Sequence, residues 1–236
     1  MKTEKLGSLE CVRVPSRLGE GKRARRVVVL MHGFGAPGED LVGLAGELNV
    51  PEDTAFVFPK APHSFTDLYG APPFVDARAW WKLDLERIER ARRSGGVRDL
   101  MKERPEGLDD ARAGVVTMLD ALESENPGVS IVIGGFSQGA MLACDTALRE
   151  RRAFAGLIVL SGALLCEDEW SALYPHVSGV PIFQSHGTDD DVLPYALAER
   201  LRAGLVSAGA IVTFVPFPGG HGLPGEVTDG LSRFLQ

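Results

Sequence analysis

One short stretch, residues 130–140, constrains the fold more than any other part of the chain. It begins with the apolar, β-branched run from Ile131 to Ile133, which is typical of a strand buried on both faces. Two glycines then predict the end of this strand, and residues 138–150 have the apolar spacing of a helix. The stretch therefore predicts a buried strand, a tight turn and a helix, the repeating unit of a parallel sheet.

Ser137 lies on the predicted turn, inside the sequence Gly135-Phe-Ser-Gln-Gly139. This is the G-x-S-x-G pattern of a nucleophile elbow, in which a strained backbone lifts a serine hydroxyl above the sheet. A chain with 28 glycines can contain the pattern by chance, and its serine would then merely cap the helix. The strand before the turn and the helix after it favour a catalytic serine.

Strands and helices are predicted to alternate along most of the chain. Alternation of this kind indicates an α/β fold, with a mostly parallel central sheet and helices on both faces. No linker divides the chain, so we expect residues 1–236 to form a single domain. The other expected strands are residues 10–14, 26–31, 54–58, 157–160, 181–184 and 211–215, and the other expected helices centre on residues 39–48, 108–122, 197–205 and 227–235.

Residues 59–105 are expected to form an insertion of loop and helix near the active site. Residues 59–82 combine prolines with aromatic residues, and residues 84–101 are polar enough for one or two exposed helices. Long loops of this type are often functional, although a surface loop anchored by its aromatic residues is the alternative. The expected substrate-binding residues are apolar or nearly so: Phe65, Tyr69, Phe74, Trp80, Trp81 and Leu164.

Two further polar loops follow predicted strands, at residues 186–191 and 219–222. Ligand sites of open parallel sheets lie beyond the carboxyl ends of the strands, so these loops should meet near Ser137. His221 is a candidate base, because a serine hydroxyl needs a neutral imidazole to accept its proton. Any one of the consecutive Asp189, Asp190 and Asp191 could orient that imidazole, and the chain order Ser, Asp, His is that of α/β-hydrolases.

The loop after the strand at residues 26–31 is suited to an oxyanion hole. Gly33 and Gly35 free its backbone to turn amides toward the site. The expected donors are the backbone amides of Phe34 and of Gln138, the residue after the candidate nucleophile. We expect His32, which begins the loop, to orient it.

Composition excludes several other functions. The net charge is -7, which argues against nucleic acid or an anionic membrane surface as a partner. No signal peptide or transmembrane run is apparent, and Cys11, Cys144 and Cys166 lack metal-binding spacing. These features predict a cytoplasmic protein with free buried thiols, no metal and no cofactor.

Four motifs, in order along the chain, resemble the carboxylesterase and acyl-protein thioesterase branch of the α/β-hydrolases. They are Leu30-Met-His-Gly-Phe-Gly35, Gly135-Phe-Ser-Gln-Gly139, His186-Gly-Thr-Asp-Asp190 with Leu193-Pro194, and Gly220-His-Gly-Leu-Pro224. The resemblance implies that Asp190 is the acid of the triad and that Trp80-Trp81 matches an aromatic pair of the family. Ala36 and Ala140 depart from residues common in the family, which weakens protein-bound lipid as a substrate.

We therefore expect a serine hydrolase that cleaves small to medium acyl carboxylic esters, or thioesters, through an acyl-enzyme. A non-catalytic protein that uses the same fold to bind a small ligand is the alternative from another class. A peptidase-like hydrolase is the alternative among enzymes, while a dienelactone-type hydrolase would resemble this chain but carry cysteine as its nucleophile. The oligomeric state stays open, with a homodimer as one alternative.

Overall fold

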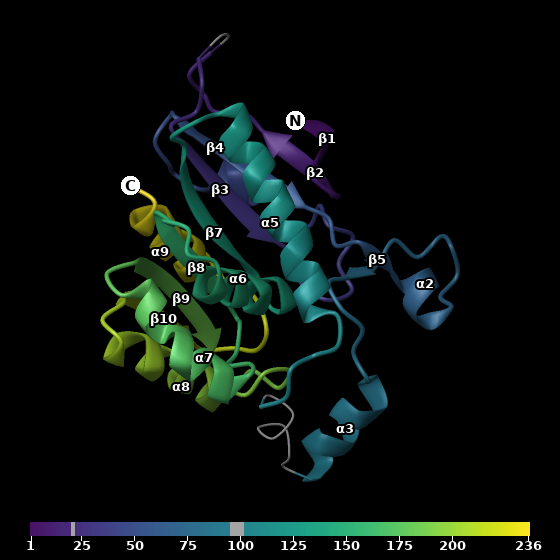
Figure 1. The fold of residues 1–236 in the computed structure, drawn as a ribbon. Helices are drawn as coiled ribbons and strands as arrows, with labels where there is room; N and C mark the ends of the chain where they lie inside the picture. The colour runs from purple at the N-terminus through teal and green to yellow at the C-terminus, as the bar shows by residue number, and fades with distance from the viewer. Residues whose placement is uncertain (20–21, 95–101) are drawn as a thin grey trace.

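The centre of the structure is a sheet to which eight strands of the described residues contribute, in the order β1-β2-β4-β3-β7-β8-β9-β10 (Figure 1). The computed structural model describes residues 1–19, 22–94 and 102–236. The strands are β1 (Lys2–Leu6), β2 (Leu9–Val14), β3 (Arg26–Met31), β4 (Thr54–Pro59), β7 (Ser130–Phe136), β8 (Gly156–Leu160), β9 (Pro181–Gly187) and β10 (Ile211–Phe217).

The sheet is parallel from β4 to β10 and antiparallel only at the edge formed by β1 and β2. In the centre, β3 pairs with β7 in a register that sets Val27 opposite Ile131 and Met31 opposite Gly135. Parallel strands end at the same edge, so this register brings the loop after β3 beside the turn after β7. The expected α/β class with a mostly parallel sheet is confirmed.

Both faces of the sheet are buried, which explains the unbroken apolar runs of the central strands. Val27, Val29 and Met31 of β3 pack into one hydrophobic cluster, and the alternate residues Val28 and Leu30 pack into another. Successive side chains of a strand point to opposite faces, so each cluster fills one side of the sheet.

Helices cover the two faces unequally, and Figure 1 shows α5 lying across one face with α9 behind the sheet. Apolar residues of α5, α6 and α8 join the first cluster, while those of α1 and α9 join the second. The helices are α1 (Leu44–Glu47), α2 (Phe65–Tyr69), α3 (Leu85–Ser94), α5 (Leu108–Glu125), α6 (Gln138–Arg149), α7 (Glu167–Leu173), α8 (Tyr195–Ser207) and α9 (Gly225–Phe234), with a 3-10 turn at Tyr174–Val177.

Several boundaries differ from those expected. β7 continues through Gly134 and Gly135 rather than ending there; the two glycines serve close packing instead, because neighbouring atoms leave no room for a Cβ at either position. A Cβ on Gly134 would lie 2.4 Å from Ile158 Cβ of β8. β9 likewise includes His186, α1 is far shorter than the expected helix at residues 39–48, and β1, which contains one buried residue, was not expected.

The segment after β4 is more ordered than its prolines and glycines suggest. It contains the short antiparallel pair β5 (His63–Ser64) and β6 (Arg78–Ala79), with α2 between them. Ser64 caps α2 by accepting a hydrogen bond from the Asp67 amide. Figure 1 shows β5, α2 and α3 projecting from the body. The expected polar helix is present as α3, but the expected region at residues 95–101 lies outside the described residues.

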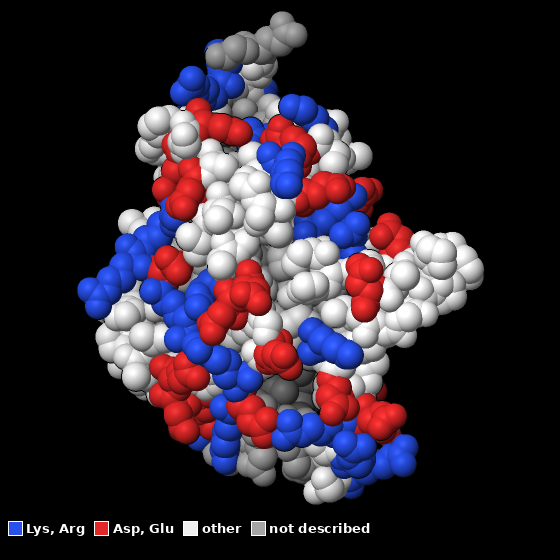
Figure 2. Space-filling model, turned by 45° about the vertical axis from the view of Figure 1, so that its right-hand side comes forward, with Lys and Arg blue, Asp and Glu red and all other residues white. Residues whose placement is uncertain are grey.

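On the face drawn in Figure 2, acidic and basic side chains are interspersed. In the portion of the chain described, no helix combines the length and the apolar character needed to cross a membrane.

A buried carboxylate joins three of the helices. Asp145 of α6 is fully buried and accepts hydrogen bonds from Arg112 Nη1 of α5 at 2.5 Å, Arg149 Nε at 2.7 Å and Trp170 Nε1 of α7 at 2.9 Å. Arg149 also bonds Glu169 at 2.6 Å. A carboxylate removed from water is stable only with such partners, so Asp145 ties α5 and α7 to the helix that follows Ser137.

Asp145→Asn should lower the free energy of unfolding by about 3 kcal/mol, because it removes the buried charge that Arg112 and Arg149 share and leaves them with more exposed carboxylates such as those of Asp109 and Glu169. Urea unfolding followed by circular dichroism measures the change. Asp120→Asn is the matched control, since the Asp120 side chain is 61% exposed where it pairs with Arg152, and it should cost at most about 1 kcal/mol. Equal losses in the two variants would contradict the role given to Asp145.

Candidate active site

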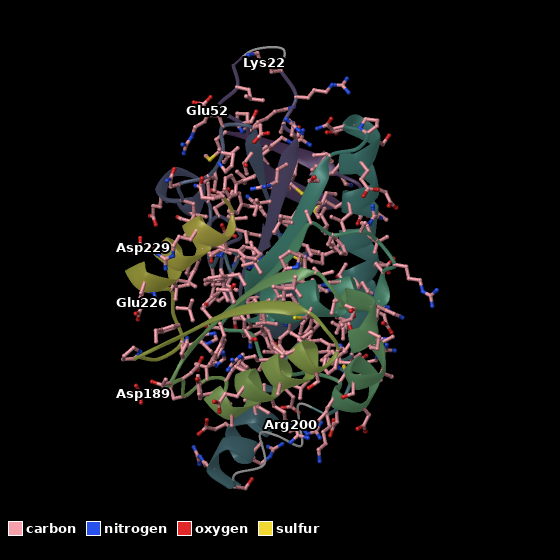
Figure 3. All side chains as sticks on the ribbon, turned by 90° about the vertical axis from the view of Figure 1, so that its left-hand side faces the viewer. Lys22, Glu52, Asp189, Arg200, Glu226 and Asp229 are labelled. Carbon is pink, nitrogen blue, oxygen red and sulfur yellow. The ribbon has the colours of Figure 1, made fainter. Side chains whose placement is uncertain are left out.

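The polar groups singled out in the sequence lie where the parallel strands end. Ser137 follows β7, Asp189 and Asp190 follow β9, and the loop containing His221 follows β10. Figure 3 shows Asp189 at the opposite end of the molecule from Lys22 and Glu52, which precede β3 and β4. The shared direction of the strands therefore gathers three distant segments at one edge.

Ser137 occupies a strained turn between β7 and α6. Its φ is 54° and its ψ is -117°, a region that residues with a side chain rarely adopt. Its amide donates to Leu160 O of β8 at 2.9 Å, which anchors the turn to the sheet. The turn also presses against the end of β3, since a Cβ on Gly139 would lie 2.2 Å from Met31 O. Glycine at this position is thus a steric requirement.

Asp190 is the aspartate that lies against the histidine. Its Oδ2 lies 2.7 Å from His221 Nδ1, and its Oδ1 accepts the amides of Val192 and Leu193 at 2.8 Å each. Burial opposes ionisation, but hydrogen bonds from His186, His221 and the Leu193 amide outweigh it and hold the pKa of Asp190 well below its ordinary value. Asp190 is therefore a carboxylate whose Oδ2 accepts a hydrogen bond from His221 Nδ1–H. In this tautomer, Nε2 of His221 is the unprotonated nitrogen and can accept a proton.

The two neighbouring aspartates lie elsewhere. Asp189 is exposed and its Oδ2 accepts the Gly219 amide at 3.2 Å, so it caps the loop that carries His221. Asp191 is exposed. His186 is fully buried, with Nε2 2.8 Å from Leu193 O and 3.2 Å from Asp190 Oδ2. It holds the acid loop in place and gives Asp190 a second imidazole contact.

The His221 ring packs on Phe136, the residue before Ser137, with ring centroids 4.8 Å apart. Within the described residues, no hydrogen bond joins Ser137 Oγ to the imidazole. Hydrogen bonds between catalytic groups are often long in the absence of substrate. Ser137 and His221 are thus on adjacent loops, without a direct hydrogen bond between their side chains.

The expected oxyanion loop lies directly beside the elbow. A Cβ on Gly33 would be 3.3 Å from Ser137 Cβ, and Gly35, with φ 83°, donates its amide to Arg78 O at 2.8 Å. Among the described residues, neither the Phe34 amide nor the Gln138 amide has an acceptor. Two amides thus remain free to bind an anionic oxygen beside Ser137.

The predicted substrate-binding residues are dispersed. Tyr69 and Trp81 line a cavity of about 1070 Å³, and Phe65 packs on Phe34 with ring centroids 4.8 Å apart. Phe74 lies on the surface, 85% exposed, and Trp80 is fully buried, so neither lines this cavity. Leu164 is a core residue, and the adjacent Leu165 lines the cavity instead.

Three features of the site were not anticipated. Met141, one helical turn after Gln138, contributes to the cavity wall, as do Leu83 and Ile88 of the segment around α3. The second contact to Asp190 comes from His186. The His-Gly-x-x-Asp spacing was the available signal for His186, since it places the imidazole four residues before the carboxylate.

Comparison with known proteins identifies relatives of the chain. A sequence model of the family described as Phospholipase/Carboxylesterase matches residues 18–236. Acyl-protein thioesterase 1 of Neurospora crassa is 36% identical over 118 residues, so this match spans about half the length of that relative (48%). Acyl-protein thioesterase 1 of Eremothecium gossypii is 29% identical over 202 residues, which cover 83% of this chain and 78% of the relative.

Solved structures are similar over almost the entire chain. The crystal structure of esterase PE8 has a TM-score of 0.76 and 30% identity, and the match covers 96% of this chain and 97% of that one. The structure of acyl-protein thioesterase 2 from Zea mays has a TM-score of 0.73 at 23% identity, covering 95% of this chain and 96% of that one. The similarity to the Zea mays structure, at this low sequence identity, shows that the two chains share a fold.

Gly139→Ala should destabilise the protein by at least about 2 kcal/mol, because its Cβ would overlap Met31 O and His32 O, which are backbone atoms that cannot rotate away. Thermal and urea unfolding measure the loss. Gly46→Ala is the control, since a Cβ there meets no atom within 4 Å and should stabilise α1 by about 0.5 kcal/mol. If Gly139→Ala were as stable as the control, the elbow would not be packed as described.

Proposed function

The chain belongs to the phospholipase/carboxylesterase family of the α/β-hydrolase fold, and from this premise we propose that Ser137, His221 and Asp190 form its catalytic triad. The protein is a serine hydrolase of esters or thioesters. The observation that carries the proposal is the 2.7 Å contact between His221 Nδ1 and Asp190 Oδ2 beside the strained Ser137 turn. A protein that only bound ligands would gain nothing from these features together.

The proposed reaction has two stages. Ser137 Oγ attacks the acyl carbon while His221 Nε2 accepts the hydroxyl proton, and Asp190 stabilises the imidazolium that results. The negative oxygen of the tetrahedral intermediate is bound by the Phe34 and Gln138 amides. His221 then gives its proton to the leaving alcohol or thiol, and water releases the acid from Ser137 by the same steps.

The acyl group is proposed to be small to medium and apolar. The cavity of about 1070 Å³ is proposed to hold the acyl chain; its apolar lining includes Trp81, Met141 and Leu165, and none of the triad residues lines it. Each methylene buried on such a wall contributes about 0.8 kcal/mol, until the cavity is full. Charged side chains, among them Lys82, Arg87 and Glu103, also border the cavity.

The proposal extends to the setting of the enzyme. It treats residues 1–236 as one domain with an insertion at residues 59–105, which is supported by the single large sheet. It includes a cytoplasmic location, which is supported by the three buried cysteines, all of them free. The net charge of -7 supports the absence of a nucleic-acid partner.

Ser137→Ala tests the proposal directly. The variant should fold normally and lose on the order of 10⁶ in turnover of a short-chain p-nitrophenyl ester, since no other group replaces the nucleophile. A fluorophosphonate probe should label the native protein and not the variant. A variant that kept a tenth of the native rate, purified free of other esterases, would overturn the proposal.

Asp190→Asn should lower turnover about 10⁴-fold, because an amide allows the imidazole to adopt the wrong tautomer. Asp191→Asn is the control, because the Asp191 side chain is exposed, and its turnover should stay within about twofold of the native value. Asp189→Asn should have an intermediate effect through the Gly219 amide that it caps. Steady-state kinetics with one ester rank the three, and equal losses would reject Asp190 as the acid.

The acyl preference should respond to the cavity wall. Trp81→Leu enlarges the cavity, so the acyl length with the highest kcat/KM should increase by two or more carbons in a series of p-nitrophenyl esters. Phe74→Ala, at an exposed position outside the cavity, should leave the optimum unchanged. An identical optimum in both variants would mean that the acyl chain binds elsewhere.

A further inference from the structure

Trp80 is bonded to both segments that supply the oxyanion donors. Its indole Nε1 donates to His32 O at 2.9 Å, two residues before the Phe34 amide. Its backbone amide donates to the side chain of Gln138 at 2.9 Å. We propose that Trp80 is a positioning residue that fixes the spacing of the two amides of the oxyanion hole, an inference that rests on the function proposed above.

The Gln138 side chain holds the tryptophan segment at two points. Its Oε1 accepts from the Trp80 amide and its Nε2 donates to Trp81 O at 3.0 Å. The side-chain amide of Gln138 therefore bonds the backbone N–H of one residue and the carbonyl of the next, in a buried environment, since Gln138 is 1% exposed. Hydrogen bonds shielded from water are stronger than exposed ones, so these two bonds hold Gln138 firmly against the backbone of Trp80 and Trp81. The backbone amide of Gln138 is one of the two proposed oxyanion donors.

The other side of the oxyanion hole is held just as firmly. His32 Nε2 accepts the Ala61 amide at 2.9 Å, so Nδ1 carries the proton and donates to Gly33 O at 2.8 Å. Burial lowers the pKa of His32, which keeps the imidazole neutral as these bonds require. The His32 and Gly33 carbonyls are thus both fixed, and the next amide in the chain is that of Phe34.

Trp80 links these two held segments. Without its indole N–H, His32 O would be a buried carbonyl with one partner fewer. The Phe34 loop would then be tied to the Trp80 segment on its far side, by the backbone bonds of Arg78 to Gly35 and Ala36, and no longer at His32. The adjacent Trp81 offers a contrast, because its indole nitrogen has no partner among the described residues. The connection to the oxyanion loop therefore belongs to Trp80 alone of the pair.

Positioning of this kind affects the transition state more than the bound substrate. An oxyanion hole works because its donors are already aimed at the oxygen before the charge develops. Removal of one such donor costs about 10² to 10³ in kcat, and a displacement of about 1 Å can cost 10²-fold. A loss of spacing should therefore lower kcat and leave KM nearly unchanged.

Trp80→Phe is the decisive variant, since it removes the N–H and keeps an aromatic ring. We expect kcat to fall about 10- to 100-fold and KM to change less than about threefold, with rates corrected by active-site titration. The affinity of an alkyl boronic acid, which forms a tetrahedral adduct on Ser137, should fall in parallel with kcat/KM. Retention of more than half of the native kcat and boronate affinity would overturn the inference.

Trp170→Phe is the matched control. It also removes a buried indole N–H bond, the one to Asp145 at 2.9 Å, but at a site remote from the oxyanion loop. It should lower the thermal midpoint and leave kcat and boronate affinity per titrated site unchanged. If both variants have a lower thermal midpoint but unchanged kcat and boronate affinity, the Trp80 bond serves only stability and the inference fails.

Gln138→Met gives an independent test and serves in place of Trp80→Phe if that variant does not fold. It keeps the Gln138 backbone amide and removes both side-chain bonds to Trp80 and Trp81. The single variant should show the same loss of kcat, and the double variant should lose less than the product of the two. Full multiplicativity would reject a shared brace.

The outcome for Ser137→Ala separates this inference from the proposed function. An inactive Ser137→Ala together with a fully active Trp80→Phe would reject only the brace. An active Ser137→Ala would reject the proposed function itself, whatever the result at Trp80.

Discussion

The contact between the turn after β7 and the end of β3 is the constraint on which the rest of the site depends. Met31 O lies so close to Gly135 and Gly139 that neither position can carry a Cβ. This contact lets α6 begin directly against the central strands and leaves Ser137 at a φ of 54°. It also brings Gly33 against the serine, so that the same closeness creates the strained turn and the adjacent oxyanion loop. Strain at the serine is tolerated because the sheet pairing and the Leu160 carbonyl hold the turn on either side.

Much of this arrangement could be predicted from the sequence, because its signals are local. The β-branched run of β7, the glycines around Ser137 and the loop at His221 each follow from a few consecutive residues. The choice among three consecutive aspartates required the resemblance to a family, because it depends on a turn in which two amides bind Asp190 Oδ1 and turn Oδ2 toward His221. The partners of Trp80 could not be predicted, since they lie 48 and 58 residues away in the chain. The substrate wall was expected from aromatic content, which does not distinguish a fully buried Trp80 from an exposed Phe74.

The two buried carboxylates, Asp145 and Asp190, have different partners and different roles. Around Asp145, two arginines and an indole satisfy a carboxylate whose contacts join helices and do not reach Ser137. Around Asp190, two imidazoles and two amides satisfy a carboxylate whose contacts end at the surface of the site. Both side chains are fully buried, but the second is surrounded by groups that can change protonation. Asp190 can therefore stabilise a proton that His221 takes up, whereas Asp145 holds α5 and α7 against α6.

The hydrogen bond from Trp80 to His32 O has a consequence for how such enzymes can diversify. Within the 59–105 segment, β5, α2 and α3 project from the body (Figure 1) and the described residues contribute much of the cavity wall, so the segment resembles an exchangeable module. Yet the same segment carries Trp80, so a replacement segment without a tryptophan at this position would remove part of the catalytic scaffold along with the cavity wall. Acyl preference should therefore change most readily through point changes at wall positions or through exchanged segments that end before Ala79, because both leave the indole and its bond to His32 O in place.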